Sequence, residues 1–139
     1  LYKLRTMYND SEVAGPQFAT LDDPRITRVG HWLRKLRLDE LPQLWNVLRG
    51  DLSLVGPRPE QEKFVADFVR DIPFYGDRHL VRPGITGWAQ VNSGYAENVE
   101  ETIEKLKYDL FYIKHMSVWM DLRILLRSVA TVVTGSGSR

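Results

Sequence analysis

The adjacent carboxylates Asp39 and Glu40 are the residues of this 139-residue chain best suited to chemistry. They follow a basic stretch, and the apolar pattern places them at the start of a helix that we expect from about Asp39 to Arg49, with Gly50 as its C-cap. A helix N-terminus and nearby guanidinium groups keep carboxylates ionised and attract phosphate. Such a carboxylate can attack phosphorus or hold Mg²⁺ against a diphosphate. Spacing alone favours a simpler interpretation, in which Asp39 is an N-cap and Glu40 a first-turn residue.

A second candidate is the proline-flanked arginine of the segment Gly56–Pro59. Two prolines stiffen the backbone around Arg58, which suits contact with phosphate or stacking on a base. Spacing alone again favours a plain structural role, in which Pro59 starts a helix and Arg58 points to solvent.

The third candidate is the segment Arg82–Gln90, which contains Gly84 and Gly87. Two glycines allow a backbone to approach a ligand closely. A tight turn that leads into a strand explains the same pattern and is the commoner outcome.

The elements predicted around these candidate residues are mostly helical. Apolar periodicity predicts helices at Thr27–Arg37, Asp39–Arg49, Glu60–Ile72 and Ser117–Val133, and another that carries Ile103, Leu106, Leu110 and Ile113. Asn98 and Glu101 resemble an N-terminal capping pair for the helix that carries Ile103. Short extended segments are predicted at Leu1–Met7, at Ser53–Pro59 and within Arg82–Asn92, with a loop at Asn9–Asp23 and a flexible tail at Gly135–Arg139.

Composition excludes several classes of protein. Hydrophobic residues make up 43% and charged residues 27% of the chain, which is typical of a packed domain rather than a disordered one. Nineteen basic against 18 acidic residues give a net charge of +1, which does not favour a nucleic-acid binder. The absence of cysteine excludes disulfides, thiolate nucleophiles and Cys-ligated zinc. The three histidines are not spaced with acids as a metal site.

The C-terminal helix leaves two interpretations open. Its apolar face is wide, but Asp121, Arg123 and Arg127 interrupt Val118–Val133, so the segment does not read as a membrane span. A core helix is the commoner fate of such a pattern. Alternatively, the helix lies in a membrane interface with Trp119 at the level of the headgroups.

Taken together, six motifs in order resemble the bacterial sugar transferase family, the monotopic polyprenyl-phosphate phosphoglycosyl transferases. These motifs span essentially the whole chain and are Lys3–Met7, Asp22–Gly30, Leu38–Leu44, Gly50–Glu60, Arg82–Val91 and Tyr108–Lys114. The resemblance implies a single compact, mostly helical α+β catalytic domain at 1–139. It also implies transfer of a sugar-1-phosphate from a UDP-sugar to undecaprenyl phosphate, with release of UMP, as the first membrane step of exopolysaccharide, O-antigen or glycan assembly.

The resemblance further assigns roles to individual residues. Asp39 would attack the β-phosphate and form a phosphosugar-aspartate, while Glu40 would hold Mg²⁺. Lys3 and Arg34 would lie near the phosphates. The nucleotide would be contacted through Pro57, Arg58 and Pro59.

Two departures from the family pattern carry expectations of their own. Many members place an arginine just after the segment that ends here at Asn92, and we expect Arg82 or another base to replace its phosphate contact. Members also carry a hydrophobic re-entrant helix before the Lys3 motif. We therefore expect this chain, which begins at Leu1, to be the C-terminal part of a longer protein on the cytoplasmic face of the bacterial inner membrane.

A different class of function stays open on sequence alone. The domain could be a catalytically silent scaffold on the membrane surface that binds nucleotide or anionic lipid through the basic segment Arg25–Arg37. The intact Asp39-Glu40 pair argues against this alternative. The sequence leaves association into a homo-oligomer open.

Overall fold

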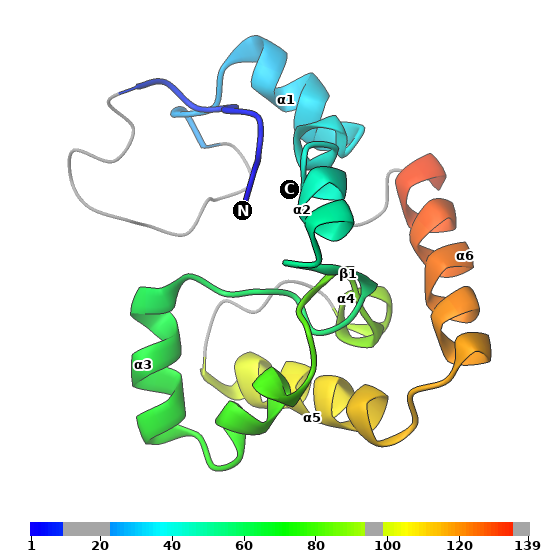
Figure 1. Cartoon of the computed structure of the whole chain (residues 1–139). Helices are drawn as coiled ribbons and strands as arrows, with labels where there is room; N and C mark the ends of the chain where they lie inside the picture. The colour runs from blue at the N-terminus through cyan, green and yellow to red at the C-terminus, as the bar shows by residue number, and fades with distance from the viewer. Residues whose placement is uncertain (10–22, 94–98, 135–139) are drawn as a thin grey trace.

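The computed structural model describes residues 1–9, 23–93 and 99–134. The elements, of which η1 and η2 are 3₁₀ helices, follow the order α1 (Arg28–Lys35), η1 (Leu38–Glu40), α2 (Gln43–Arg49), β1 (Ser53–Val55), α3 (Glu62–Asp71), η2 (Tyr75–Leu80), β2 (Gly84–Thr86), α4 (Trp88–Asn92), α5 (Val99–Lys114) and α6 (Val118–Thr134) (Figure 1). The described residues are mostly helical, with one two-stranded sheet, which agrees with the predicted α+β class.

The two short strands lie at the centre of the molecule and pair in parallel (Figure 1). Ser53 aligns with Gly84 and Val55 with Thr86, and the connection between the strands runs through α3 and η2. Glycine is required at position 84, because a Cβ there would lie 2.2 Å from the backbone nitrogen of Gly56. The close approach that Gly84 permits is therefore to the neighbouring strand and not to a ligand.

Helix α5 joins the two apolar clusters of the described core. The first cluster contains the buried side chains of Val55, Tyr112 and Ile124. The second contains Ile72, Tyr75 and Leu106. Because α5 contributes to both clusters, it connects the strand pair and α6 on one side to α3 and η2 on the other.

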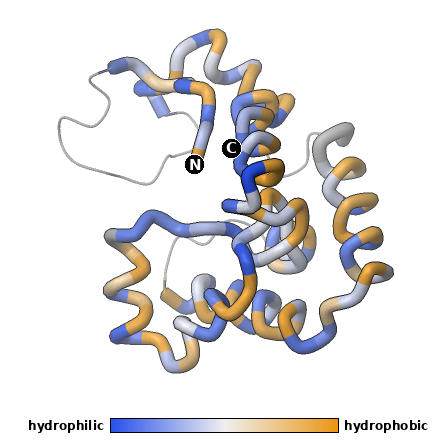
Figure 2. Tube along the Cα trace, viewed as in Figure 1, coloured by the Kyte–Doolittle hydropathy of each residue, from blue (hydrophilic) through white to orange (hydrophobic). Residues whose placement is uncertain are grey.

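Helices α1 and α2 lie outside both clusters and leave apolar side chains uncovered. Hydrophobic positions recur along these two helices and along α6 (Figure 2). Between Val29 and Leu48 the exposed large side chains, here called the α1–α2 apolar face, are Val29, Trp32, Leu36, Leu38, Leu41, Leu44, Trp45 and Leu48. Periodicity thus predicted α1 correctly, but the apolar stripe of this helix does not face the core.

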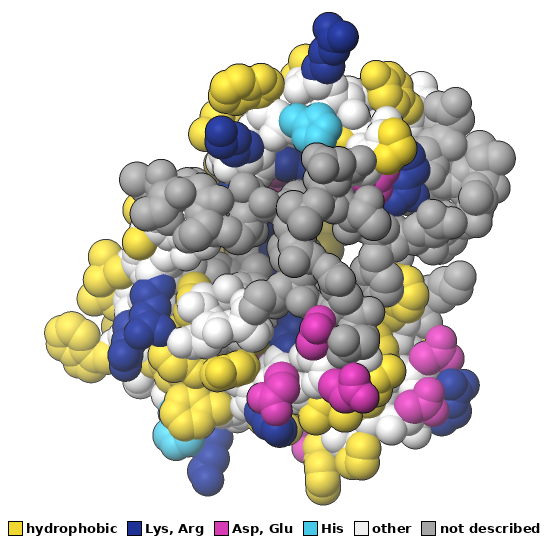
Figure 3. All heavy atoms as spheres, turned by 180° about the vertical axis from the view of Figure 1, so that it is seen from behind, with side chains coloured by type: hydrophobic (Ala, Val, Ile, Leu, Met, Phe, Trp, Pro, Cys, Tyr) yellow, Lys and Arg dark blue, Asp and Glu magenta, His cyan; other side chains and the backbone are white. Residues whose placement is uncertain are grey.

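Helix α6 packs one side into the core, as one interpretation of the sequence predicted, and leaves an apolar row on its other side exposed. Ile124 is fully buried in the first cluster, whereas Trp119 on the same helix is 81% exposed. The outward row also includes Val118, Leu122, Leu126 and Val129. Seen from behind, hydrophobic side chains gather over α1 and along the flank formed by α5 and α6, next to lysines and arginines (Figure 3).

The predicted helix from Asp39 to Arg49 is wrong, because the structure divides it into η1 and α2. Proline 42 has no N–H to continue the helical hydrogen bonds, and it occupies the N-cap position of α2. The prediction that Pro59 starts the next helix is also wrong, since α3 begins at Glu62 after the N-cap Gln61.

One of the predicted extended segments forms no strand, and another is shorter than expected. Residues 1–7 form no strand, and only Met7 makes an isolated antiparallel bridge, with Ile26. The strand predicted within Arg82–Asn92 ends at Thr86, and the rest of that segment is α4. The capping position Asn98, residues 10–22 of the predicted loop and the tail 135–139 lie outside the described residues.

None of the described helices is both long enough and apolar enough to cross a membrane.

Candidate active site around Asp39 and Glu40

The short helix η1 holds both carboxylates inside the protein. Arg37, just before it, adopts a left-handed conformation with φ of 55°, which turns the chain sharply after α1. The turn closes with hydrogen bonds from Glu40 N to the Arg37 carbonyl and from Leu41 N to the Leu38 carbonyl. Asp39 is 2% and Glu40 is 9% exposed. Neither acts as an N-cap, and a three-residue helix supplies little dipole, so the positive field at the pair must come from side chains.

Lys3 supplies part of that field. Its Nζ lies 3.0 Å from Asp39 Oδ2 and 3.9 Å from Glu40 Oε1. The backbone fixes this approach, since Leu4 N donates to the Asp39 carbonyl at 2.9 Å and Tyr2 N donates to Asn46 Oδ1 at 3.0 Å. The Lys3 side chain is 43% exposed, so it forms the solvent-facing wall of the carboxylate pair.

Arg58 also binds Glu40, through hydrogen bonds and an ion pair. Its Nη2 lies 2.5 Å from Glu40 Oε1 and its Nη1 lies 3.4 Å from Oε2, so the contact uses both carboxylate oxygens. Arg58 therefore points into the site. The simpler interpretation of the sequence, in which Arg58 points to solvent, is wrong. Pro57 and Pro59 flank it in the loop that follows β1, where Gly84 N donates to the Pro57 carbonyl at 2.9 Å.

These cations keep Glu40 ionised. Burial by itself would raise the pKa of Glu40, but the hydrogen bond and charge of Arg58, together with the charges of Lys3 and Arg37, outweigh it and lower the pKa below its ordinary value of 4.5. Arg37 Nη1 lies 3.9 Å from Glu40 Oε1. The site thus holds a carboxylate that remains charged well into the acidic range.

Asp39 has one oxygen with no hydrogen-bond partner. Among the described residues, nothing donates to its buried Oδ1, while Oδ2 faces Lys3. A buried acceptor without a donor is costly unless a ligand completes it. Two adjacent carboxylates also fit Mg²⁺, which takes one or two protein carboxylates together with substrate phosphates. Within the described ranges no cluster of three or more metal-ligating side chains occurs.

Two other predicted phosphate ligands lie away from the pair. Arg34 Nε donates to Thr6 Oγ1 at 2.9 Å, which ties α1 to the segment that carries Lys3. Arg82 is exposed beside Gly50, the C-cap of α2, so its guanidinium group stands at the end of α2 distant from η1. The structure therefore brings Lys3 and Arg58 to the carboxylates. Arg34 is linked to them only through the segment that carries Lys3, and Arg82 lies elsewhere.

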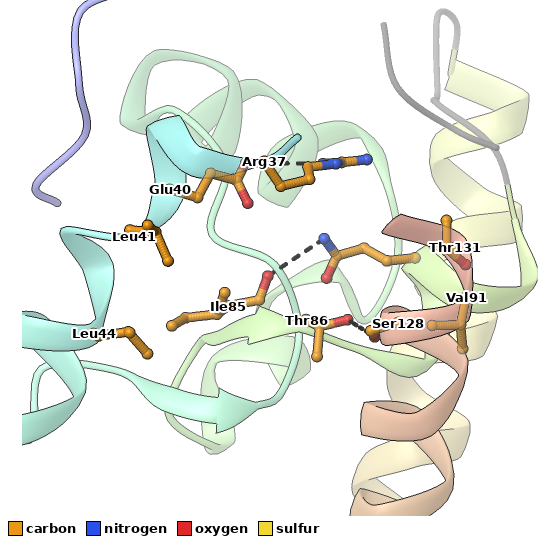
Figure 4. A pocket seen from close by; sticks show the side chains of 10 residues that line it. Arg37, Glu40, Leu41, Leu44, Ile85, Thr86, Val91, Ser128 and Thr131 are labelled. Atoms are coloured by element: carbon orange, nitrogen blue, oxygen red, sulfur yellow. Dashed lines mark hydrogen bonds and ion pairs between the residues drawn. The ribbon is translucent and has the colours of Figure 1, made fainter. Parts of the chain in front are cut away.

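A pocket of about 230 Å³ opens beside Glu40, between η1 and α2 on one side and α4 and α6 on the other (Figure 4). Its walls are Arg37, Glu40, Leu41, Leu44, Ile85, Thr86, Gln90, Val91, Ser128 and Thr131. Strand β2 contributes Ile85 and Thr86, and the Thr86 and Ser128 hydroxyls lie 2.6 Å apart. The pocket is therefore continuous with the carboxylate site through Glu40.

Comparison with known proteins identifies the family. Residues 1–135 match the family described as bacterial sugar transferase. The chain belongs to the bacterial sugar transferase family. It is 55% identical over its whole length to the UDP-N-acetylgalactosamine-undecaprenyl-phosphate N-acetylgalactosaminephosphotransferase of Aeromonas hydrophila, of which it covers 33%.

Two further relatives of this sugar transferase carry the name UDP-glucose:undecaprenyl-phosphate glucose-1-phosphate transferase. The relative from Escherichia coli is 44% identical over 91% of the chain, which covers 27% of that protein. The relative from Caulobacter vibrioides is 45% identical over 96% of the chain, which covers 51% of that protein. The chain thus covers about a third of the Aeromonas hydrophila relative, about half of the Caulobacter vibrioides relative and just over a quarter of the Escherichia coli relative.

The loop that carries Arg58 also contacts a buried ion pair that the sequence analysis did not predict. Arg78 of η2 lies 2.8 Å from Asp109 Oδ2 of α5, and both side chains are almost fully buried. Arg78 also donates to Tyr75 Oη at 2.6 Å and to the Arg58 carbonyl at 2.8 Å. Burial raises the pKa of Asp109 although Arg78 opposes the shift. A charged residue on the buried face of α5 was the available sequence signal for Asp109, whereas nothing local pointed to Arg78.

Proposed function

We propose that this protein transfers a sugar-1-phosphate from a UDP-sugar to undecaprenyl phosphate and releases UMP. The observation that carries the proposal is the buried Asp39-Glu40 pair enclosed by Lys3, Arg37 and Arg58. Its relatives' names describe this type of reaction for N-acetylgalactosamine and glucose. A site with two anions and three cations can hold a diphosphate and supply a nucleophile to it.

In the proposed first step, Asp39 is the nucleophile. A carboxylate oxygen of Asp39 forms a bond to the β-phosphorus of the UDP-sugar. The bond from that phosphorus to the bridging oxygen breaks, and the electron pair leaves with UMP. The product on the protein is a phosphosugar-aspartate. The buried Oδ1 of Asp39 supports this role because it has no hydrogen-bond partner among the described residues. Its lone pairs are therefore not held by a donor and are available to attack phosphorus.

The cations explain how a carboxylate could approach a diphosphate. Two anions repel each other, and a positive field at the meeting point lowers that barrier. Lys3 and Arg58 both lie within hydrogen-bond or ion-pair distance of the carboxylates and are partly exposed, so each can turn toward a phosphate. We propose that Lys3 contacts the phosphates and that the Pro57-Arg58-Pro59 loop contacts the nucleotide.

We propose Glu40 as the residue that holds Mg²⁺, with the diphosphate of the substrate. Its lowered pKa supports this role, since a metal ligand must be ionised. When bound, Mg²⁺ would neutralise negative charge on the phosphates. Arg58 and Lys3 then have to release part of their contact with Glu40, which frees them for the substrate.

In the proposed second step, a phosphate oxygen of undecaprenyl phosphate attacks the phosphosugar-aspartate. The bond from phosphorus to Asp39 breaks, and the carboxylate is regenerated. The acceptor's hydrocarbon tail stays in a bilayer, so the site must lie at a membrane surface. The exposed α1–α2 apolar face, next to basic residues of α1, supports attachment to a membrane surface, which we propose to be the cytoplasmic face of the bacterial inner membrane. There the reaction would begin exopolysaccharide or related glycan assembly.

The test is an intact-mass measurement on protein incubated with a UDP-sugar and Mg²⁺ but no acceptor. We expect a sugar-phosphate adduct on the wild type and on Asp77→Asn, since Asp77 is exposed on η2. We expect none on Asp39→Asn. A protein that binds nucleotide but neither forms an adduct nor releases UMP would instead be a catalytically silent scaffold.

A further inference from the structure

Two side chains in the wall of the pocket beside Glu40 also belong to an exposed surface of the protein. Leu41 and Leu44 line the pocket, and at 53% and 46% exposed they are members of the α1–α2 apolar face. They lie across the pocket from Thr131 of α6, while Glu40 and Arg37 border it at another edge (Figure 4). The pocket therefore connects the buried carboxylate site with the α1–α2 apolar face.

The lining of the pocket offers apolar contact more than hydrogen bonds. Its apolar side chains are Leu41, Leu44, Ile85 and Val91. The hydroxyls of Thr86 and Ser128 bond to each other, and that of Thr131 donates to a carbonyl of its own helix. The exception is Gln90 Oε1, a buried acceptor with no donor among the described residues, which needs a water or a hydroxyl of the ligand. Apart from that atom, the lining suits hydrocarbon, which gains from apolar burial and requires no hydrogen bond.

The size of the pocket limits how much of a ligand it can hold. Its volume of about 230 Å³ lies below the roughly 300–1,000 Å³ of pockets that enclose drug-sized ligands. An apolar cavity of about 150 Å³ is nevertheless enough to bind benzene. The pocket thus has room for one short hydrocarbon segment, and the rest of the ligand must lie outside it.

Charge at the Glu40 edge of the pocket indicates what this hydrocarbon carries. Arg37 lines the pocket there, and its Nη1 lies 3.9 Å from Glu40 Oε1. Arg58 binds the same carboxylate through both oxygens, so Glu40 has a closer cation. A phosphate at this edge would meet Arg37, whose guanidinium fork suits phosphate oxygens, and would lie next to the Asp39-Glu40 pair.

We propose that this pocket is the binding site and entrance for the acceptor, an isoprenoid monophosphate. Its phosphate lies at Arg37, its first isoprene units pack against the apolar walls, and the rest of its chain leaves between Leu41 and Leu44 into the bilayer. The sugar nucleotide uses the side of the carboxylates beside Lys3 and Arg58, neither of which lines the pocket. The two substrates thus reach the carboxylate pair from different sides. This inference rests on the proposed function and gives its second substrate a place.

The first experiment measures binding and needs no turnover. Calorimetry compares farnesyl phosphate, kept below its micellar concentration, with UMP, which has no isoprenoid chain. Thr131→Phe fills the pocket from α6, and Leu44→Glu places a charge at its opening. We expect each variant to bind farnesyl phosphate about tenfold more weakly than the wild type, or worse, and to bind UMP equally well.

Two controls place the same substitutions outside the pocket. Val129→Phe changes an outward residue of α6 that is 62% exposed, and Leu48→Glu changes a residue of the α1–α2 apolar face that is 79% exposed. Both should bind farnesyl phosphate like the wild type. A wild type that does not bind it, unchanged binding in both pocket variants, or an equal loss of UMP binding would overturn the proposal. So would equally tight binding of dihexanoyl phosphatidic acid, since the pocket would then be a general phospholipid site.

The second experiment separates the pocket from the proposed reaction. The phosphosugar adduct is formed with Mg²⁺ and UDP-N-acetylgalactosamine or UDP-glucose, freed of nucleotide and mixed with farnesyl phosphate. We expect Leu44→Glu to form the adduct but to lose it about tenfold more slowly than the wild type, and Thr131→Phe serves the same measurement if Leu44→Glu does not fold. Wild-type rates of loss would overturn the pocket assignment and leave the reaction in place. If no adduct forms on the wild type but farnesyl phosphate binding still depends on the pocket, the assignment stands and the proposed reaction fails.

Discussion

At the scale of single residues, the negative charges of two buried carboxylates are compensated by three cationic side chains. Glu40 faces Arg58 through both oxygens, and Lys3 and Arg37 stand at longer range. Lys3 also meets Asp39. Removing a single charge therefore changes both the chemistry and the stability of the site.

Glu40→Gln is expected to remove most activity together with its Mg²⁺ dependence. A neutral amide is a much poorer ligand for Mg²⁺ than a carboxylate, while its shape is nearly the same. Activity is measured as UMP release across a Mg²⁺ titration. An unchanged titration curve would show that Glu40 does not hold the ion.

Glu40 should also make stability depend on pH at the acidic end. Its pKa is lower in the folded protein than the ordinary 4.5, so its stabilisation is complete above that value and is lost as the pH falls through the lower, folded value. We expect the free energy of unfolding of wild type and Glu40→Gln to converge below about pH 4.5, and to differ most near neutrality. Urea unfolding at several pH values measures this. A difference that stays constant down to pH 3 would contradict it.

Arg58→Ala should weaken binding of UMP by roughly tenfold, the scale of a lost charge-assisted hydrogen bond. The loop itself should persist, because the flanking prolines and the bond from Arg78 to the Arg58 carbonyl shape the backbone. Calorimetry with UMP gives the affinity, and circular dichroism checks the fold. Wild-type affinity in a folded variant would remove Arg58 from the nucleotide site.

At the scale of elements, η2 and α5 support the loop around Arg58 that we propose as the nucleotide contact. Arg78 contacts Asp109, Tyr75 and the Arg58 carbonyl at once. Arg78→Lys keeps the charge but cannot make all three contacts, because it lacks the planar guanidinium fork. We expect a several-fold loss of UMP affinity, and little further loss when Arg78→Lys is added to Arg58→Ala. Additive losses in the double variant would mean that Arg78 acts on stability alone.

The strand pair gives a second test at this scale. A Cβ at position 84 would overlap the backbone of Gly56, whereas a Cβ at Gly76 meets nothing within 4 Å. We expect Gly84→Ala to cost about 1–3 kcal/mol in the free energy of unfolding and Gly76→Ala to be near neutral. Thermal unfolding of the two variants measures the difference. Equal stability would show that β1 and β2 are spaced more widely.

At the scale of the whole molecule, the α1–α2 apolar face is one of the surfaces that leave large hydrophobic side chains exposed. Trp45 is 58% exposed on this face, and a membrane would cover it. We expect Trp45→Glu to lower partitioning onto vesicles of anionic phospholipid by tenfold or more, since burying an aromatic side chain is worth about 2 kcal/mol. Leu80→Glu, at a 77% exposed residue of η2, should partition like the wild type. Equal losses in both variants would argue against a specific face.

Features that depend on neighbours along the chain could be predicted from the order of the amino acids. Helical periodicity located α1, α3 and α6, the prolines marked the stiff loop around Arg58, and the adjacent carboxylates marked the site. The family motifs added the expectation that Lys3 lies near the substrate phosphates, and the structure places its Nζ 3.0 Å from Asp39 Oδ2. All of these signals are local or repeat with a fixed spacing.

The surroundings of those features, in contrast, follow from how the chain folds. Periodicity shows that a helix has an apolar face but not what covers that face, because core and lipid are equally apolar. It therefore could not show that the apolar stripe of α1 is exposed. Nor could spacing show that Arg78 reaches Asp109, or that Gln90 faces Glu40 across a pocket, because folding joins these residues from distant segments. The charge of a buried carboxylate depends on such partners, and a linear pattern does not contain the distances between them.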